Sequence, residues 1–233
     1  MSNNTQNSNV VKAKTSVDPL FLKAEHLAND FSLFPKHSTL SLSNEIKGLL
    51  DENTITSNKK SYEELAVDEY VTQVIQPAQD KNRLGAKRII ADLKGRIICE
   101  SDNGPFYRAE IELNFGTRTR RIAFIAQERT ANNGAWMPEH HLAACKAIRD
   151  FAELSLPIIY LIDTPGADAG EIANSNNQAH SISQAIVESA NVDVPTVGIV
   201  IGAGYSGGAI PLASANILLS VRDGIFNTIQ PQG

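Results

Sequence analysis

Residues 157–167, with the sequence PIIYLIDTPGA, decide the fold together with residues 196–209, TVGIVIGAGYSGGA. Each stretch is an apolar run of strand length that ends in a glycine-containing loop, and a segment of helical character follows each loop. This order of strand, loop and helix predicts an α/β fold with a largely parallel sheet that is buried on both faces. Because ligands bind at the carboxyl ends of parallel strands, we expect the loops 163–170 and 202–208 to form the site.

The composition is that of a globular protein with a moderate acidic balance. The 233 residues include 21 basic and 26 acidic side chains, so the formal net charge is −5, and 42% of them are hydrophobic. This charge argues against a nucleic-acid partner, and no apolar run reaches the roughly 18–20 residues of a membrane span. Two cysteines, Cys99 and Cys145, are too few for a disulfide framework or a four-cysteine zinc site. With no apolar signal segment in residues 1–16, the sequence predicts a cytoplasmic protein.

The chain before residue 61 differs in composition from the rest. Ten of the first sixteen residues are Asn, Ser, Thr or Gln, which predicts a flexible tail because such a segment buries little apolar surface. Apolar residues at loosely helical spacing between residues 20 and 53 predict short docking helices. We therefore divide the chain into residues 1–60, a tail with docking helices, and residues 61–233, the main domain.

Two longer helices are predicted in the main domain, the first opening at Met137-Pro-Glu139 because proline suits the first helical turn. Adjacent helical residues point about 100° apart, so His140 and His141 are interpreted as a surface pair and not as metal ligands. The expected buried stripes are Leu142, Cys145, Ile148 and Ala152 in the first helix, and Ala179, Ile182, Ile186 and Ala190 in the second.

The glycine-rich loop matches two unrelated short motifs. Residues 202–207 satisfy GxGxxG with Asp223 about twenty residues later, as in dinucleotide-binding domains. That fingerprint normally occupies the first βαβ unit, whereas several strand and helix units come first here, so an NAD(P)-binding domain is a remote alternative. Residues 204–208 also satisfy GxSxG, the nucleophile elbow of α/β-hydrolases. That fold places its histidine after the serine, but all five histidines of this chain come before Ser206.

Backbone chemistry gives the two loops a third interpretation, an oxyanion hole. Gly207 and Gly208 lack a Cβ at the start of a predicted helix, so a substrate oxygen can approach their unpaired N–H groups closely. An N–H group from the 163–170 loop could converge with them, and one such donor is worth about 2.7–4 kcal/mol in a transition state. Asp163 is expected to hold its loop by accepting backbone N–H bonds. The alternative is a purely conformational role, in which these glycines only permit tight turns.

Four stretches of this sequence together resemble the carboxyltransferases of biotin-dependent acyl-CoA carboxylases, within the crotonase (ClpP/enoyl-CoA hydratase-like) superfamily. The nearest likeness is to the α subunit of the bacterial acetyl-CoA carboxylase carboxyltransferase. Residues 157–167 resemble that family's PII-x-x-IDTPGA, and residues 200–209 resemble its VIGxGxSGGA. Residues 134–139 (GAWMPE) and 229–233 (IQPQG) resemble two further family stretches that open helices. The likeness covers about residues 85–233.

The resemblance implies a crotonase-like ββα spiral, incomplete at the C-terminus and completed by a partner chain. It implies transfer of a carboxyl group between carboxybiotin and a short acyl-CoA, of the acetyl-CoA to malonyl-CoA type, through backbone oxyanion holes. Carried over, Gly207 and Gly208 supply the hole on the biotin side, and Gly166 and Ala167 line the facing loop. The substrate-binding positions are Gly204, Tyr205, Ser206 and Asp168, with Ser206 as a helix N-cap and not a nucleophile. Arg118, Arg120, Arg121 and Arg129 could meet the CoA phosphates or form a solvated cluster.

The resemblance also implies partners. The chain contains no four-cysteine zinc ribbon and no biotinylation Met-Lys-Met. The resemblance therefore implies a second carboxyltransferase subunit or C-terminal fragment, and a separate biotin carboxyl carrier protein. It also implies a hetero-oligomer and no metal in this chain. Ala203 and Tyr205 replace the family's usual Glu and Gly, and Asp168-Ala-Gly170 replaces Tyr-Pro-Gly. These departures leave two other hypotheses open: another crotonase-type thioester enzyme, such as an acyl-CoA decarboxylase, and a non-catalytic paralogue subunit.

Overall fold

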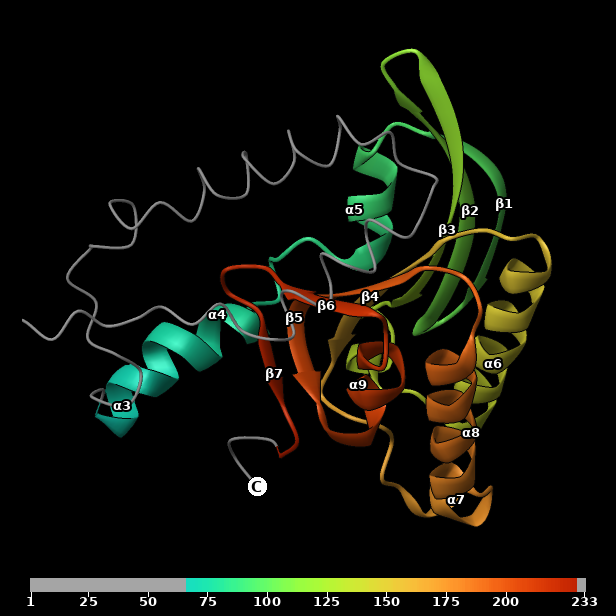
Figure 1. Cartoon of the computed structure of the whole chain (residues 1–233). Coiled ribbons are helices and arrows are strands. Elements are labelled where there is room, and N and C mark those ends of the chain that lie inside the picture. Colours follow the sequence, from blue (N-terminus) through green and yellow to red (C-terminus); the bar gives the residue numbers. More distant parts are fainter. Residues whose placement is uncertain (1–65, 230–233) are drawn as a thin grey trace, which may run out of the picture. The chain divides into compact units, whose positions relative to one another are not determined.

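The computed structural model describes residues 66–229. The predicted tail and docking helices of residues 1–60 lie outside the described residues, and so does the end of the 229–233 stretch. Between residues 138 and 220, helices and strands alternate in the order that residues 157–167 and 196–209 predict (Figure 1).

The described strands form one seven-stranded mixed sheet. Its order is β1-β2-β3-β4-β5-β6, and β7 also pairs with β5. β1 to β3 are antiparallel, whereas β3 to β6 and the β5–β7 pair are parallel, so the sheet is largely parallel as predicted. The strands are β1 Arg96–Asn103, β2 Phe106–Phe115, β3 Arg118–Gln127, β4 Ile158–Thr164, β5 Thr196–Tyr205, β6 Ile217–Ser220 and β7 Ile225–Asn227.

Helices cover both faces of this sheet (Figure 1). α6 and α9 pack with the strands around Ile125, Tyr160 and Val200, while α5 packs on the other face around Phe124 and Leu161. Two-sided burial explains why β4 and β5 are apolar runs and not alternating sequences. The helical elements are α3 Val67–Tyr70, η3 Val71–Ile75, α4 Gln76–Gln79, α5 Ala86–Asp92, η4 Asn132–Gly134, α6 Pro138–Glu153, α7 Glu171–Ser175, α8 Gln178–Asn191 and α9 Ser206–Ala213.

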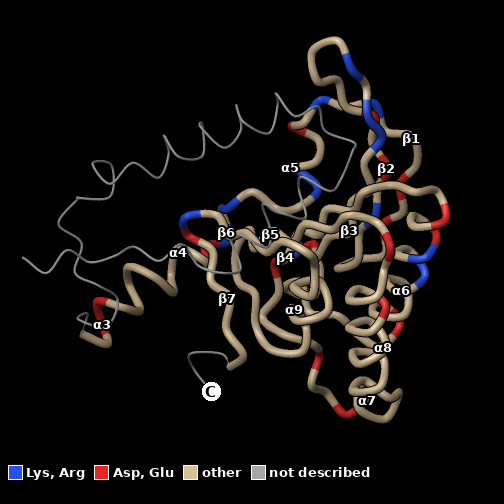
Figure 2. Tube along the Cα trace, in the orientation of Figure 1, with Lys and Arg blue, Asp and Glu red and all other residues tan. Residues whose placement is uncertain are grey.

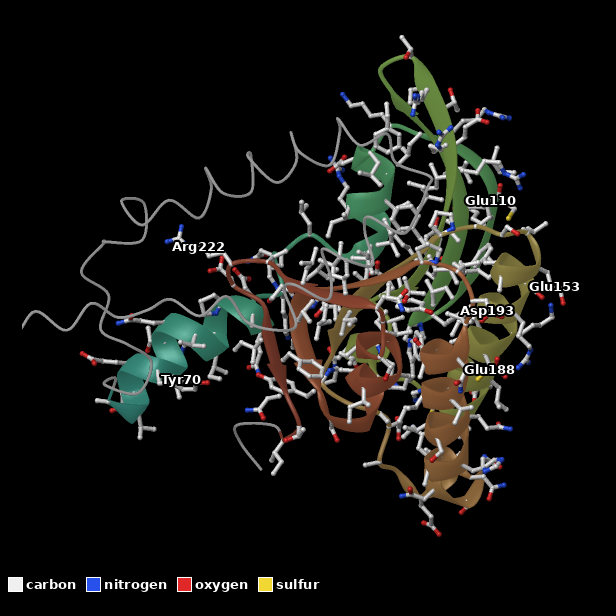
Figure 3. The ribbon with its side chains drawn as sticks, in the orientation of Figure 1. Tyr70, Glu110, Glu153, Glu188, Asp193 and Arg222 are labelled. Carbon is white, nitrogen blue, oxygen red and sulfur yellow. The ribbon has the colours of Figure 1, made fainter. Side chains whose placement is uncertain are left out.

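The buried faces of the two long helices differ from the predicted stripes. In α6, Cys145 and Ile148 are buried as expected, but Leu142 is 47% exposed. The deeply buried residues of α8 are not its predicted apolar stripe but Gln178, Ser181, Ala185 and Ser189. α8 packs against α6 and α9, and small side chains permit close helix contact. Arg149 of α6 forms an ion pair at the surface with Glu188 of α8 and so joins the two helices. Figure 3 labels Glu188 on α8.

The prediction of a surface histidine pair is wrong, because both side chains are buried. His140 Nδ1 accepts the N–H of Met137 at 3.0 Å and so stabilises the start of α6. The His141 ring is fully buried, with an edge-on contact to Trp136 at a centroid distance of 5.3 Å. No hydrogen-bond partner for either ring nitrogen of His141 is found among residues 66–229. Burial disfavours the charged ring and lowers the pKa of His141 to about 4.

This buried histidine predicts an acid-dependent loss of stability. The unfolded ring takes up its proton near pH 6.5, but the folded ring resists it until about pH 4. Its contribution is therefore intact above pH 6.5, and the free energy of unfolding falls by up to about 3 kcal/mol as the pH drops towards 4. We expect His141→Phe to remove this dependence, as measured by urea unfolding at several pH values. Parallel pH profiles for the variant and the wild type would contradict the assignment.

Among the described residues, no helix is both long and apolar enough to cross a membrane. The cytoplasmic location stays a prediction.

Candidate active site

The loop that follows β4 is shaped by its own side chain and by one glycine. Thr164 Oγ1 accepts the N–H of Gly166 at 3.1 Å and donates to the carbonyl of the same residue at 2.8 Å. Gly166 has a φ of +134°, a conformation that side-chain-bearing residues rarely adopt. The chain is thus turned sharply directly after the strand, which places Gly166 and Ala167 at the carboxyl end of β4.

The second loop turns directly from β5 into α9. Tyr205 occupies the N-cap position without a side-chain cap, so the prediction that Ser206 caps the helix is wrong. Ser206 instead stands at the turn with a φ of +54° and is exposed. Gly207 and Gly208 are then the second and third residues of the helix, whose N–H groups have no carbonyl four residues earlier within it. The first turn of α9 therefore offers donors and a positive dipole end.

The two loops meet at Gly208. A Cβ on Gly208 would overlap the carbonyl carbon of Gly166 and would lie 2.6 Å from the nitrogen of Ala167. At Gly207 a Cβ would meet only the end of the Ile182 side chain, at 3.1 Å. The structure thus brings together the four residues predicted to be catalytic. Their chemical role stays a prediction.

The four predicted substrate-binding residues lie in different surroundings. Gly204 lies inside the sheet, paired with Thr164 and Phe226, and the Tyr205 side chain packs with Ile75 and Ala203 in a buried cluster. Tyr205 therefore does not plug the space between the loops. Asp168 Oδ1 accepts the N–H of Gly170 at 2.8 Å, and so orders the same loop. Of the four, Ser206 is the one that is exposed.

A buried ion pair, which the sequence did not reveal, ties the two strand ends together. Arg83, from the loop between α4 and α5, donates from Nη2 to both carboxylate oxygens of Asp163 at 2.9 Å and from Nη1 to the carbonyl of Ile201. Asp163 Oδ1 also accepts the N–H of Ala203 at 3.3 Å, as expected of a loop-holding carboxylate. Burial raises the pKa of Asp163, and the Arg83 charge offsets this rise in part. The guanidinium lies against Gly202, where a Cβ would overlap it.

A second buried side chain, Gln127, connects the same elements from the end of β3. Its Nε2 donates to the carbonyl of Gly208 at 2.7 Å, and its Oε1 accepts the N–H of Asp163 at 3.2 Å. Gln127 is fully buried. No motif signalled either Gln127 or Arg83, because each acts on residues distant in the sequence. A polar residue at the carboxyl end of a buried strand was the only available sign of Gln127.

Other residues singled out in the sequence have structural contacts. Trp136 is fully buried and donates from Nε1 to the carbonyl of Pro105 at 2.9 Å. Arg129 donates to the carbonyls of Gln79 at 3.0 Å and Asp80 at 2.7 Å, at the end of α4. Basic residues gather at the turn between β2 and β3 (Figure 2), where Arg118 and Arg120 are exposed. Within the part of the chain that the structure describes, no cluster of three or more His, Cys, Asp or Glu could hold a metal ion.

Comparison with solved structures identifies the class of fold. Transcarboxylase 12S, solved with methylmalonyl-coenzyme A and methylmalonic acid bound, is similar with a TM-score of 0.57 and 15% sequence identity. The match covers 65% of this chain and 30% of that one. The described domain therefore has the crotonase-type fold that the sequence predicts, whereas its completion by a partner chain stays a prediction.

The sequence comparisons point to one family. Residues 123–233 match the family described as acetyl co-enzyme A carboxylase carboxyltransferase-like. The acetyl-coenzyme A carboxylase carboxyl transferase subunit alpha of Pelagibacter ubique is 39% identical over 142 residues, 61% of this chain and 34% of the relative. The corresponding subunit of Campylobacter curvus is 38% identical over 102 residues, 44% and 33% of the two chains. The chain thus spans about one third of the length of these curated relatives.

The ion pair predicts a large and specific loss of stability. Arg83→Met leaves the Asp163 carboxylate buried without its partner, which costs about 3–5 kcal/mol in buried pairs, and we expect the lower end because Arg83 is 15% exposed. The double variant Arg83→Met/Asp163→Asn should recover much of this loss, as measured by urea unfolding. Arg88→Met breaks an exposed pair with Asp92 and should cost less than about 1 kcal/mol. A double variant no more stable than Arg83→Met would refute the explanation.

Proposed function

We propose that this chain is a carboxyltransferase subunit, which moves a carboxyl group between carboxybiotin and a short acyl-CoA such as acetyl-CoA. The observation that carries the proposal is the contact between Gly208, in the first turn of α9, and the Gly166-Ala167 peptide of the facing loop. The family of residues 123–233 supports the reaction class. The curated relatives also support the reaction class, over the one third of their length that this chain matches.

The first turn of α9 suits an oxygen that gains negative charge. The N–H groups of Gly207 and Gly208 have no acceptor within the helix, and the helix dipole favours an anion at this end. When bound, carboxybiotin would supply the carboxyl group: the bond from its ring nitrogen to the carboxyl carbon would break, a bond to the α-carbon of the thioester would form, and the proton lost from that carbon would end on the ring nitrogen. Gly207 and Gly208 would bind the charged oxygen of the biotin ring, and Gly166 and Ala167 would close the opposite side. One donor of this kind contributes about 2.7–4 kcal/mol.

The proposed partners are a second carboxyltransferase subunit and a separate biotin carrier protein. The side chains of Ile217, Leu218 and Leu219 on β6 are 41–50% exposed. Three exposed apolar residues on one strand are unusual for an isolated surface and support contact with another polypeptide.

The reaction is tested with the full chain purified with its associated polypeptides. We expect malonyl-CoA to be converted to acetyl-CoA at a rate that depends on added biocytin, a soluble biotin derivative, and liquid chromatography measures both thioesters. Conversion without biocytin would favour the decarboxylase hypothesis. No conversion of malonyl-CoA or methylmalonyl-CoA under either condition would favour the non-catalytic subunit. Saturable binding of NAD would instead support a dinucleotide site.

The glycine pair provides a second test of the proposal. In Gly208→Ala the new methyl group meets backbone atoms of the facing loop, so we expect kcat to fall by about 10²–10³-fold. In Gly207→Ala it meets only the flexible end of Ile182, so the loss should be less than about tenfold. The kcat values are measured in the biocytin-dependent assay, with circular dichroism to confirm that both variants fold. An unchanged kcat in Gly208→Ala would argue against the hole.

A further inference from the structure

We propose that Gln127 is a positioning residue that sets the separation between the first turn of α9 and the end of β4. The proposal rests on the proposed function, because it concerns the same site. Gln127 touches no substrate in this scheme. It acts through Gly208 and Asp163, the two residues whose backbone groups it binds.

The argument starts from the chemistry of a buried amide. Gln127 is fully buried, so each polar atom of its side chain needs a partner, and each has one. Its nitrogen donates to the carbonyl of Gly208, and its oxygen accepts the N–H of Asp163. An amide carries a donor and an acceptor on two different atoms and is uncharged at any pH at which the protein folds. The two hydrogen bonds therefore fix both loops relative to β3.

The position of Gly208 is sensitive to such a constraint. Its Cα already packs against the Gly166-Ala167 peptide, so movement of α9 in one direction is blocked and movement in the other opens the site. Gln127 provides the restraint against opening, because its 2.7 Å bond holds the Gly208 carbonyl. A displacement of about 1 Å can lower a catalysed rate by about 10²-fold. We therefore expect loss of Gln127 to lower kcat more than it raises KM.

A substitution of the same shape gives a readout that general destabilisation does not. In Gln127→Glu a protonated carboxyl group can still donate to Gly208 and accept from Asp163, whereas a carboxylate can only accept. The charged groups near it are Asp163 on β4 with its partner Arg83 from the loop between α4 and α5, Arg129, and the adjacent Glu128, which accepts the N–H of Lys87. We expect the kcat of this variant to fall as the pH rises, through a titration step that the wild type lacks.

The experiment compares Gln127→Glu, Gln127→Met and Asn216→Asp in the full chain with its associated polypeptides. Asn216 is a control for the same amide-to-carboxylate change, because its Oδ1 acts as an acceptor, for the N–H and the hydroxyl of Thr196 at the opposite end of β5. For Gln127→Met we expect about a 10²-fold lower kcat at all pH values, with KM for malonyl-CoA within about threefold of wild type. Asn216→Asp should keep the wild-type kcat and pH profile. Wild-type kcat in Gln127→Met, or no new pH step in Gln127→Glu, would overturn the proposal.

A measurement without substrate separates this proposal from the proposed function. Hydrogen exchange should quicken in Gln127→Met peptides that cover residues 163–170 and 204–210, but not in those that cover the β1–β2 hairpin. If the wild type transfers no carboxyl group, the proposed function fails, and the exchange data still test the positioning role. Exchange in both loops equal to that of the wild type would overturn the role of Gln127, whatever the activity.

Discussion

The buried Asp163 is the residue on which the arrangement of the site depends. Its carboxylate accepts hydrogen bonds from Arg83 and from the N–H of Ala203, and its own N–H donates to Gln127. Its carbonyl lies so close to Gly134 that a side chain at that position would overlap it. The end of β4 is thus fixed by β3, by β5 and by the segment before α6. The loop that contains Gly166 and Ala167 begins directly after β4, so these contacts also set its position.

Fixing a loop with a buried ion pair carries a cost in solvation free energy. Two charges lose their hydration, and a well-packed apolar pair of similar volume is often as stable. What the ion pair provides here is direction, because the Arg83 fork binds two oxygens of Asp163 and one carbonyl of β5 at once. An apolar contact has no preferred direction, so it could not fix the positions of the ends of β4 and β5 relative to each other so closely. Gln127 adds the same kind of directed contact without a charge.

The sequence predicts the fold and the site loops better than it predicts the groups that hold them. The loops follow from local rules: an apolar strand, a glycine with a special φ, and a helix start. Gln127 and Arg83 act on residues 81 and 118 positions away at the farthest, so no local pattern contains the information. The resemblance to a family supplied the spiral fold, which strand and helix spacing alone could not distinguish from other parallel α/β folds.

The errors have identifiable physical causes. The sequence predicts a surface pair at His140 and His141 because adjacent helical residues do not share a ligand face, yet the His141 ring is buried against Trp136, and burial lowers its pKa. The stripe of α8 was assigned from apolar residues, but close packing selects small ones such as Ser181 and Ala185. In both helices, residue size and ring shape decide which side chains are buried.

The two glycines of α9 need separate explanations, although they are adjacent in the sequence. At Gly208 packing alone requires glycine, because any Cβ would overlap the facing loop. That requirement would exist in a protein with no catalytic function. At Gly207 the packing does not require glycine so strictly, since a Cβ would meet only the movable end of Ile182. The glycine at position 208 is therefore weak support for an oxyanion hole, and the stronger support is that the close contact at 208 brings a second loop to donors that the helix itself leaves unpaired.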